Sequence, residues 1–159
     1  MEQTYYLIIM GALLLEYALS TISSILNMNS ITEKVPDGFQ DHYNEDKYAK
    51  SQAYLRDNTR FGLISGTFSL GLTLVVIHTG LFGILDTFVR GSAVHPIMAG
   101  LMFFGILFIV NDILNLPFSV YGTFVIEERY GFNKTTPKTF ILDKLKGYGL
   151  TIVLGSLIM

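Results

Sequence analysis

The sequence predicts an all-α protein of polytopic membrane helices, with three complete spans, the start of a fourth and helical extensions on the cytoplasmic side. Apolar residues gather in long runs, and charges gather in a few segments between them. Half of the 159 residues are hydrophobic and 15% are charged, against about 25% charged in an average soluble domain. We expect residues 1–159 to form a single membrane region. The net charge of −2 argues against a nucleic-acid partner.

The first three apolar runs are each long enough to cross a bilayer. They cover residues of about 5–26, 61–85 and 97–121, and about 20 apolar residues suffice to cross about 30 Å of hydrocarbon. The first run contains one charge, Glu16. It follows Glu2 and no basic residue, so it does not have the character of a signal peptide.

The fourth run is shorter than a full span. It covers residues 147–159, which are 13 residues, and at about 1.5 Å per residue it reaches about 20 Å. It stops at Met159 without a flanking charge or aromatic anchor, which would leave the last helix carbonyls unpaired in lipid. We therefore expect this chain to be a fragment of a longer protein.

Basic residues are distributed unevenly between the connecting segments. Five lie between the first and second runs, five between the third and fourth, and one, Arg90, lies between the second and third. The positive-inside rule places the two basic segments in the cytoplasm. The N-terminus and the Arg90 loop then lie outside. The ten cytoplasmic residues are Lys34, Lys47, Lys50, Arg56, Arg60, Arg129, Lys134, Lys138, Lys144 and Lys146.

Two of the connecting segments carry helix signals. No helix breaker separates Tyr43 from Phe61, so the second membrane helix is expected to project several turns into the cytoplasm. Thr136-Pro137 has the pattern of an N-cap followed by proline at the first helical position. It predicts a helix that leads toward the fourth run.

Four polar residues inside the runs are candidates for the lining of a cavity. Glu16 should face protein or water, because an ionised carboxylate at the centre of a span costs at least about 2.5 kcal/mol; a protonated or paired structural glutamate is the alternative. Asn111, Asp112 and Asn115 share an arc of about 100° on the third run. We favour a cavity wall here, with hydrogen bonding between packed helices as the alternative. Pro117 is expected to kink this helix.

Most catalytic signatures are absent from the sequence. None of the three histidines, His42, His78 and His95, belongs to an H-E-x-x-H zinc motif. The sequence contains no cysteine, so a zinc site built from thiolates is also absent. His78 is expected to be a hydrogen-bonded packing residue. Glu127-Glu128 precede Arg129 at the end of the third run, where a solvated helix end is favoured over a catalytic carboxylate pair. Composition and spacing alone leave the function open.

Residues 115–136 resemble the N-terminal membrane region of the CAAX prenyl endopeptidases, the integral-membrane zinc metalloproteases of peptidase family M48. The family pattern is a proline-kinked helix end followed by I-E-x-x-[aromatic]-G-F-N-[basic]. The matching residues are Ile126, Glu127, Gly131, Phe132, Asn133 and Lys134. Val35-Pro36, parts of residues 48–61, and residues 143–146 add weaker support. The resemblance covers nearly the whole chain.

The resemblance implies a barrel of seven long helices around a water-filled chamber with an inward-facing zinc site. Prenylated CAAX peptides are the implied substrates in eukaryotes, and membrane-protein quality control is the implied role in bacteria. The family's H-E-x-x-H lies beyond the fourth span. No catalytic or metal-binding residue is therefore assigned to this chain, which alone is expected to be inactive. Zinc is expected in the intact protein, in the bacterial inner membrane or the endoplasmic reticulum.

The implied function is the chamber-forming N-terminal region of a zinc metalloendopeptidase that cleaves membrane-associated or prenylated peptides. Its expected partners are the bilayer, the C-terminal catalytic part of the same protein and the peptide substrate. The alternative is a non-enzymatic polytopic membrane protein, such as a transporter fragment. A structural joint is predicted where the third helix ends, with Gly131 in the left-handed conformation. Its residues are Pro117, Glu127, Gly131, Phe132 and Asn133.

Overall fold

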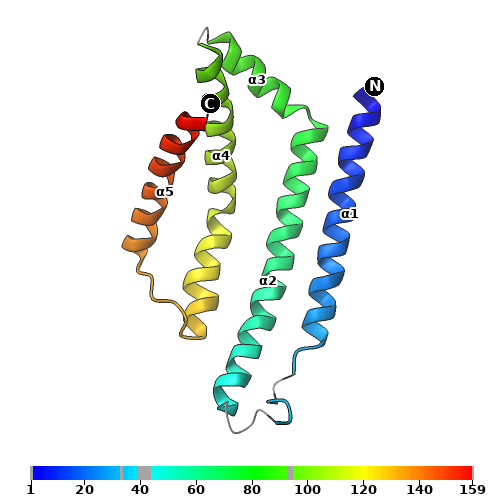
Figure 1. Cartoon of the computed structure of the whole chain (residues 1–159), viewed down its shortest axis with the longest axis vertical. Coiled ribbons are helices and arrows are strands. Elements are labelled where there is room, and N and C mark those ends of the chain that lie inside the picture. Colours follow the sequence, from blue (N-terminus) through cyan, green and yellow to red (C-terminus); the bar gives the residue numbers. More distant parts are fainter. Residues whose placement is uncertain (1, 33, 39–43, 93–94, 159) are drawn as a thin grey trace.

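The computed structural model is a set of helices joined by short connections (Figure 1). It describes residues 2–32, 34–38, 44–92 and 95–158. Within these ranges, the sequence prediction of an all-α membrane fold is confirmed. The elements in chain order are α1 (Glu2–Asn29), α2 (Glu45–His78), α3 (Leu81–Gly91), α4 (Pro96–Tyr121), the π-helical segment η1 (Gly122–Glu127) and α5 (Pro137–Ile158).

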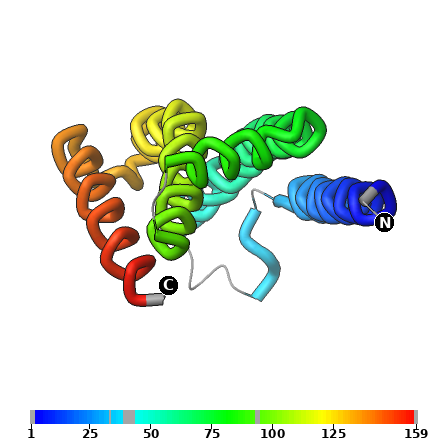
Figure 2. Tube along the Cα trace, turned by 90° about the horizontal axis from the view of Figure 1, so that it is seen from above, coloured from blue at the N-terminus to red at the C-terminus, as the bar shows by residue number. Residues whose placement is uncertain are grey.

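The long helices stand side by side, and the shorter α3 lies across one end of the molecule. Figure 1 shows α3 connecting the ends of α2 and α4 on the side where α1 begins, while the end of α1, the start of α2 and the 128–136 connection lie toward the opposite end. Seen along the bundle, the helices follow an arc, with α1 at one end of the arc and α5 at the other (Figure 2). The described chain therefore forms a curved wall of helices.

Three of the helices are long and apolar enough to cross a membrane. These segments are Gln3–Asn29, Glu45–His78 and Pro96–Glu127. Most of their large apolar side chains are exposed, as is expected of helices whose outer surface faces lipid rather than water. The buried apolar residues in the described part of the chain are few: Val35, Val89, Ala99 and Ile126.

The second apolar run is not one helix, which corrects the predicted span of 61–85. α2 ends at His78, and Gly80 has a φ of +70°, a left-handed conformation that glycine adopts without a steric penalty. The chain then turns into the separate helix α3. At its other end α2 begins at Glu45, where the Asn44 side chain accepts a hydrogen bond from the Lys47 amide at 3.0 Å. The predicted helical extension ahead of Phe61 is therefore confirmed.

The third run continues through its proline. Pro117 lies inside α4, and the helix passes directly into η1. The contact between η1 and α2 is close at Gly122, where an added Cβ would stand 3.8 Å from the Phe61 ring. Ile126 of η1 is buried. The end of this long helix is thus packed against α2.

α5 begins where the sequence predicts. The Thr136 hydroxyl accepts a hydrogen bond from the Thr139 amide at 3.2 Å, and Pro137 is the first helical residue. The helix is continuous to Ile158. This helix contains Lys138, Lys144 and Lys146, which the charge count had treated as part of a connecting segment. No helix breaker interrupts residues 138–146.

Candidate functional site

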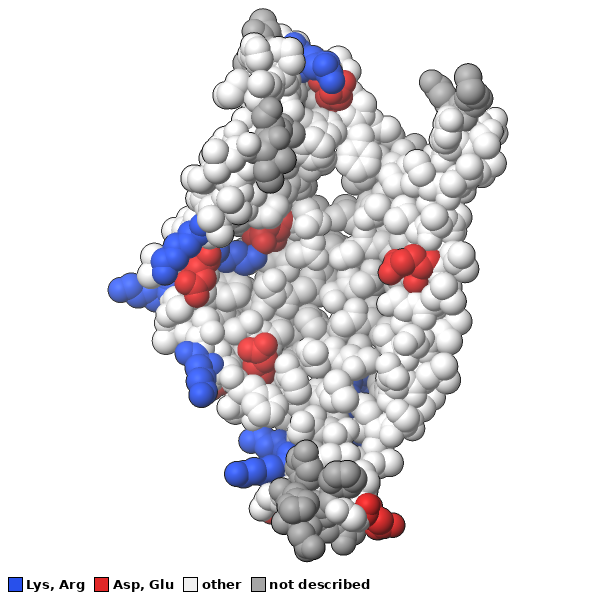
Figure 3. Space-filling view, in the orientation of Figure 1, with Lys and Arg blue, Asp and Glu red and all other residues white. Residues whose placement is uncertain are grey.

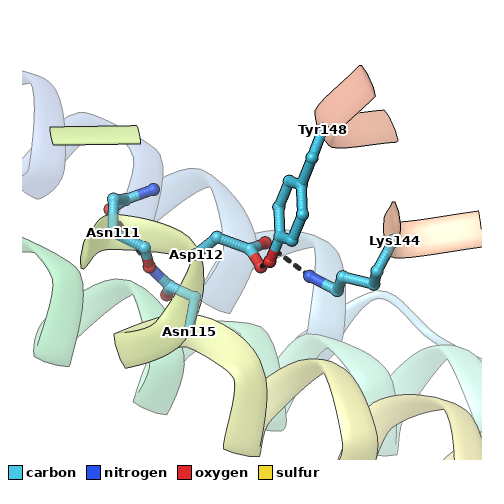
Figure 4. A network of polar contacts seen from close by, with 5 residues as sticks. All are labelled: Asn111, Asp112, Asn115, Lys144 and Tyr148. Atoms are coloured by element: carbon cyan, nitrogen blue, oxygen red, sulfur yellow. Dashed lines mark hydrogen bonds and ion pairs between the residues drawn. The ribbon is translucent and has the colours of Figure 1, made fainter. Parts of the chain in front are cut away.

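Asp112 makes the principal polar contact between α4 and α5. Its carboxylate pairs with the Lys144 ammonium and accepts a hydrogen bond from the Tyr148 hydroxyl (Figure 4). Asp112 lies about halfway along the membrane-spanning segment Pro96–Glu127. The side chains of Lys144 and Asp112 are only 24% and 21% exposed. This ion pair therefore joins α4 and α5 about halfway along the Pro96–Glu127 segment.

The remaining polar residues of α4 face in a different direction. Asn115 accepts a hydrogen bond from the Ser69 hydroxyl of α2 at 3.4 Å. Its amide nitrogen donates to the Asn111 carbonyl at 2.8 Å and to the Asn111 side-chain oxygen at 3.1 Å. The predicted polar arc is thus divided between two neighbours, with Asp112 turned to α5 and Asn115 turned to α2. Asn111 remains exposed.

Glu16 lines a groove of about 550 Å³ between α1 and α2. The Glu16 carboxylate has no hydrogen bond or ion pair among the described residues, and no lysine or arginine lines the groove. Hydroxyl, amide and small side chains make up most of the lining, which gives this part of the wall a mixed polar and apolar surface. The lining residues are Leu13, Glu16, Tyr17, Ser20, Thr21, Ser24, Asn58, Thr59, Gly62, Leu63, Gly66, Ser69, Leu70 and Thr73.

Two hydrogen bonds hold α1 beside α2. The Tyr17 and Thr67 hydroxyls are 2.5 Å apart, and the Tyr6 hydroxyl lies 3.1 Å from Nδ1 of His78. The predicted hydrogen bond of His78 is therefore present, and the residue is exposed within this chain. Tyr6, which had no role in the sequence prediction, is the partner of His78.

The end of the third membrane helix has the hydrogen-bond pattern of a Schellman motif. Gly131 has a φ of +68°, which confirms the predicted left-handed conformation. The Phe132 amide donates to the Glu127 carbonyl and the Gly131 amide to the Glu128 carbonyl, both at 2.9 Å. These bonds satisfy carbonyls that a helix end would otherwise leave unpaired. Asn133 supports the turn by accepting from the Thr135 amide at 2.6 Å.

This turn is fixed to the extension of α2. The Arg129 guanidinium and the Tyr130 hydroxyl both donate to the Asp57 carboxylate, at 3.1 Å and 2.7 Å. The Tyr54 ring packs edge-on against Tyr130 and Phe132, with centroid distances of 5.5 Å and 4.8 Å. Phe132, a residue of the predicted joint, thus packs against α2. The joint therefore connects two membrane helices.

The hydrogen bond to the Asp57 carboxylate raises the pKa of the Tyr130 hydroxyl above its ordinary value of 10.0, and burial adds to this effect. The bond needs the protonated phenol. Because the pKa is higher in the folded protein, the contribution of this contact to stability is complete below about pH 10. It is lost as the pH rises through the pKa of the folded state.

The α2 side of the joint was not identified from the sequence, although its spacing carries a signal. Lys50, Tyr54, Asp57 and Phe61 follow one another at four, three and four residues, which places them on one face of a helix. Phe61 continues this face with ring contacts to Phe118 and Tyr121 at 6.0 Å and 5.0 Å. The residues of α4 and of the Gly131 turn that pack against this face could not be inferred without the fold.

The chain does not supply a metal site within its described residues. No three of their histidine, aspartate or glutamate side chains stand close enough together to hold an ion, and His42 lies outside the described residues. The zinc implied by the family resemblance therefore does not fit the residues described here. Its ligands would have to come from elsewhere in an intact protein.

Comparison with known proteins identifies close relatives. Residues 24–159 match the family model described as the CAAX prenyl protease N-terminal region with five membrane helices. The probable CAAX prenyl protease 1 of Schizosaccharomyces pombe is 34% identical over 143 residues, covering 81% of this chain and 30% of the relative. CAAX prenyl protease 1 of Saccharomyces cerevisiae is 28% identical over 164 residues, covering 96% and 36%.

A solved structure supports the same assignment. The crystal structure of S. mikatae Ste24p superposes with a TM-score of 0.86 at 27% identity, covering 97% of this chain and 37% of that chain. The chain spans about a third of the length of these proteins. The match to the family model begins at residue 24, inside α1, and continues to residue 159. This chain therefore belongs to the CAAX prenyl protease family and corresponds to its N-terminal membrane region.

Proposed function

We propose that this chain forms part of the chamber wall of a zinc metalloendopeptidase that cleaves membrane-associated or prenylated peptides. The observation that carries the proposal is the family match over residues 24–159. Membership of that family supports the chamber, the zinc and the substrate class that we propose. The partners would be the bilayer, the peptide substrate and a C-terminal catalytic part of the same protein, which supplies the zinc ligands.

The arrangement of polar residues supports the role of a chamber wall. The helices follow an arc in Figure 2, and Figure 3 shows acidic groups at mid-height over α1 and over the contact between α4 and α5. The groove that contains Glu16 lies on the same wall. The exposed side chain of Asn111 and the Asn115–Ser69 contact add polar surface at α4. A curved wall with polar groups at this depth suits a hydrated interior.

The protease proposal is tested on the product of the complete gene. Purified protein reconstituted in vesicles should release the C-terminal tripeptide from a farnesylated CAAX peptide. A zinc chelator should abolish release, and the same peptide without the prenyl group should be cleaved more slowly. A gene that encodes further spans and no H-E-x-x-H would instead support the non-enzymatic alternative, such as a transporter.

The N-terminus and α3 are proposed to lie outside the cytoplasm, in the lumen if the membrane is that of the endoplasmic reticulum. The yeast relatives favour that membrane over a bacterial inner membrane. The end of α1, the start of α2 and the 128–136 connection all lie toward the end of the molecule opposite α3 (Figure 1), as a shared cytoplasmic side requires. A single cysteine at Ser92 should react with an impermeant thiol reagent added outside, and one at Ser51 should not. Labelling of Ser51 alone would reverse the topology.

The chamber wall predicts a difference between two exposed positions of α4. Asn111 and Ile113 are both exposed within this chain, and two residues along a helix point about 200° apart. A cysteine at Asn111 should react several-fold faster with a small water-soluble thiol reagent than a cysteine at Ile113, which would face lipid or protein. Equal rates would show that no hydrated chamber adjoins this face of α4.

A further inference from the structure

We propose that α3 is an interfacial helix whose exposed apolar edge inserts into the lipid of the non-cytoplasmic leaflet. The helix is too short to cross the bilayer, because its 11 residues span about 16 Å. The inference concerns a contact with the bilayer surface and is independent of the proposed protease activity.

The connection to α2 places α3 at the membrane boundary. The apolar part of α2 runs from Phe61 to His78, which are 18 residues and about 27 Å of helix. This is close to the thickness of the hydrocarbon layer. Gly80, in its left-handed conformation, then redirects the chain into α3. α3 therefore starts where α2 leaves the hydrocarbon, and in Figure 1 it runs across that end toward α4.

α3 separates apolar from charged side chains around its axis. Val89 packs into the protein and is 1% exposed, whereas Ile84 and Phe88 are 63% and 67% exposed. Ile84 and Phe88 are four residues apart and therefore share one edge of the helix. Asp86 and Arg90, also four residues apart, lie about 200° away from them. An exposed apolar edge opposite a charged face is the pattern of a helix that lies in the plane of a membrane surface.

The charged face has no net charge to attract anionic lipid. Nε of Arg90 donates to both carboxylate oxygens of Asp86, at 2.8 Å and 2.9 Å. The two formal charges of α3 therefore offset each other. The membrane contact must therefore come from insertion of the Ile84 and Phe88 side chains. We expect this contact to be equally strong on zwitterionic and on anionic phospholipid. The bilayer that surrounds α2 and α4 is continuous with this surface.

Nitroxide labels in the cysteine-free protein test the contact. Single cysteines at Ile84, Phe88 and Arg90 are labelled, and the protein is reconstituted in phosphatidylcholine vesicles. Collision with oxygen, which concentrates in lipid, is compared with collision with a water-soluble nickel chelate. The ratio of oxygen to nickel collisions should be several-fold higher at Ile84 and Phe88 than at Arg90. The Arg90 side chain is 69% exposed, which makes it a control matched in exposure.

Two results would overturn the proposal. Nickel collisions at Ile84 and Phe88 as frequent as those at Arg90 would show that α3 stands clear of the membrane. Protection of both positions from oxygen and nickel would show that protein covers this edge, either another segment or a second copy. Ile84 and Phe88 are tested in separate variants. If one variant fails to fold, the other still reports on the membrane contact. Phosphatidylserine added to the vesicles should leave the ratio unchanged, because the Asp86–Arg90 pair is neutral.

Discussion

Replacing Gly131 with valine is expected to lower folded yield, thermal stability and activity together. Gly131 adopts a φ of +68°, and a left-handed backbone costs a residue with a Cβ about 1–2 kcal/mol. A β-branched side chain is especially unfavourable there. The added Cβ would stand 3.6 Å from Nζ of Lys50, an ordinary contact distance, so the cost comes from the backbone conformation. The fraction of monodisperse protein that remains after heating, measured by size-exclusion chromatography, reports the stability.

Two control variants separate backbone strain from chemistry. Gly131→Asn should retain most of the stability, because asparagine tolerates the left-handed conformation better than other residues. Glu127→Gln should be nearly silent, because Glu127 caps the turn through its backbone carbonyl. In the proposed full-length protease, Glu127→Gln should also leave the zinc content unchanged. Loss of zinc from a folded Glu127→Gln protein would instead place Glu127 in the active site.

The sequence predicts local structure better than it predicts the partners across helices. The Gly131 turn and the Thr136-Pro137 helix start depend on neighbouring residues, so propensities and capping rules are sufficient to find them. The break at Gly80 was missed because a single glycine inside an apolar run is compatible with an uninterrupted helix. Hydropathy therefore could not separate α2 from α3.

The contacts of the candidate site show the same limit. The arc formed by Asn111, Asp112 and Asn115 was visible in the helix period, yet Asp112 faces α5 and Asn115 faces α2. Charge counting placed Lys144 in a cytoplasmic segment, and it did not indicate that the Lys144 ammonium pairs with Asp112. A hydropathy profile treats each charge as isolated. A partner on another helix changes the cost of placing that charge in the membrane.

The Asp112–Lys144 pair should be the most sensitive single interaction between α4 and α5. Its two side chains are mostly covered, and the carboxylate also accepts the Tyr148 hydrogen bond. Replacing Asp112 with leucine leaves the Lys144 ammonium without its partner inside the membrane region. Removal of one member of a fully buried pair typically costs about 3–5 kcal/mol, and the cost should be smaller here because both side chains are partly exposed. We expect Asp112→Leu to reduce the yield of folded protein sharply, and Lys144→Met to do the same.

Removal of both charges distinguishes this ion pair from a tightly packed apolar contact. The double variant Asp112→Leu/Lys144→Met should regain most of the lost stability, because an apolar replacement of a buried pair is often neutral or stabilising. Asp143 and Lys146 form the matched control on the same helix, 3.5 Å apart with side chains 60% and 76% exposed. Asp143→Asn should produce no measurable change, since exposed pairs contribute little. A double variant less stable than both single variants would show that the cost is one of packing and that the charges of Asp112 and Lys144 do not hold α5 against α4.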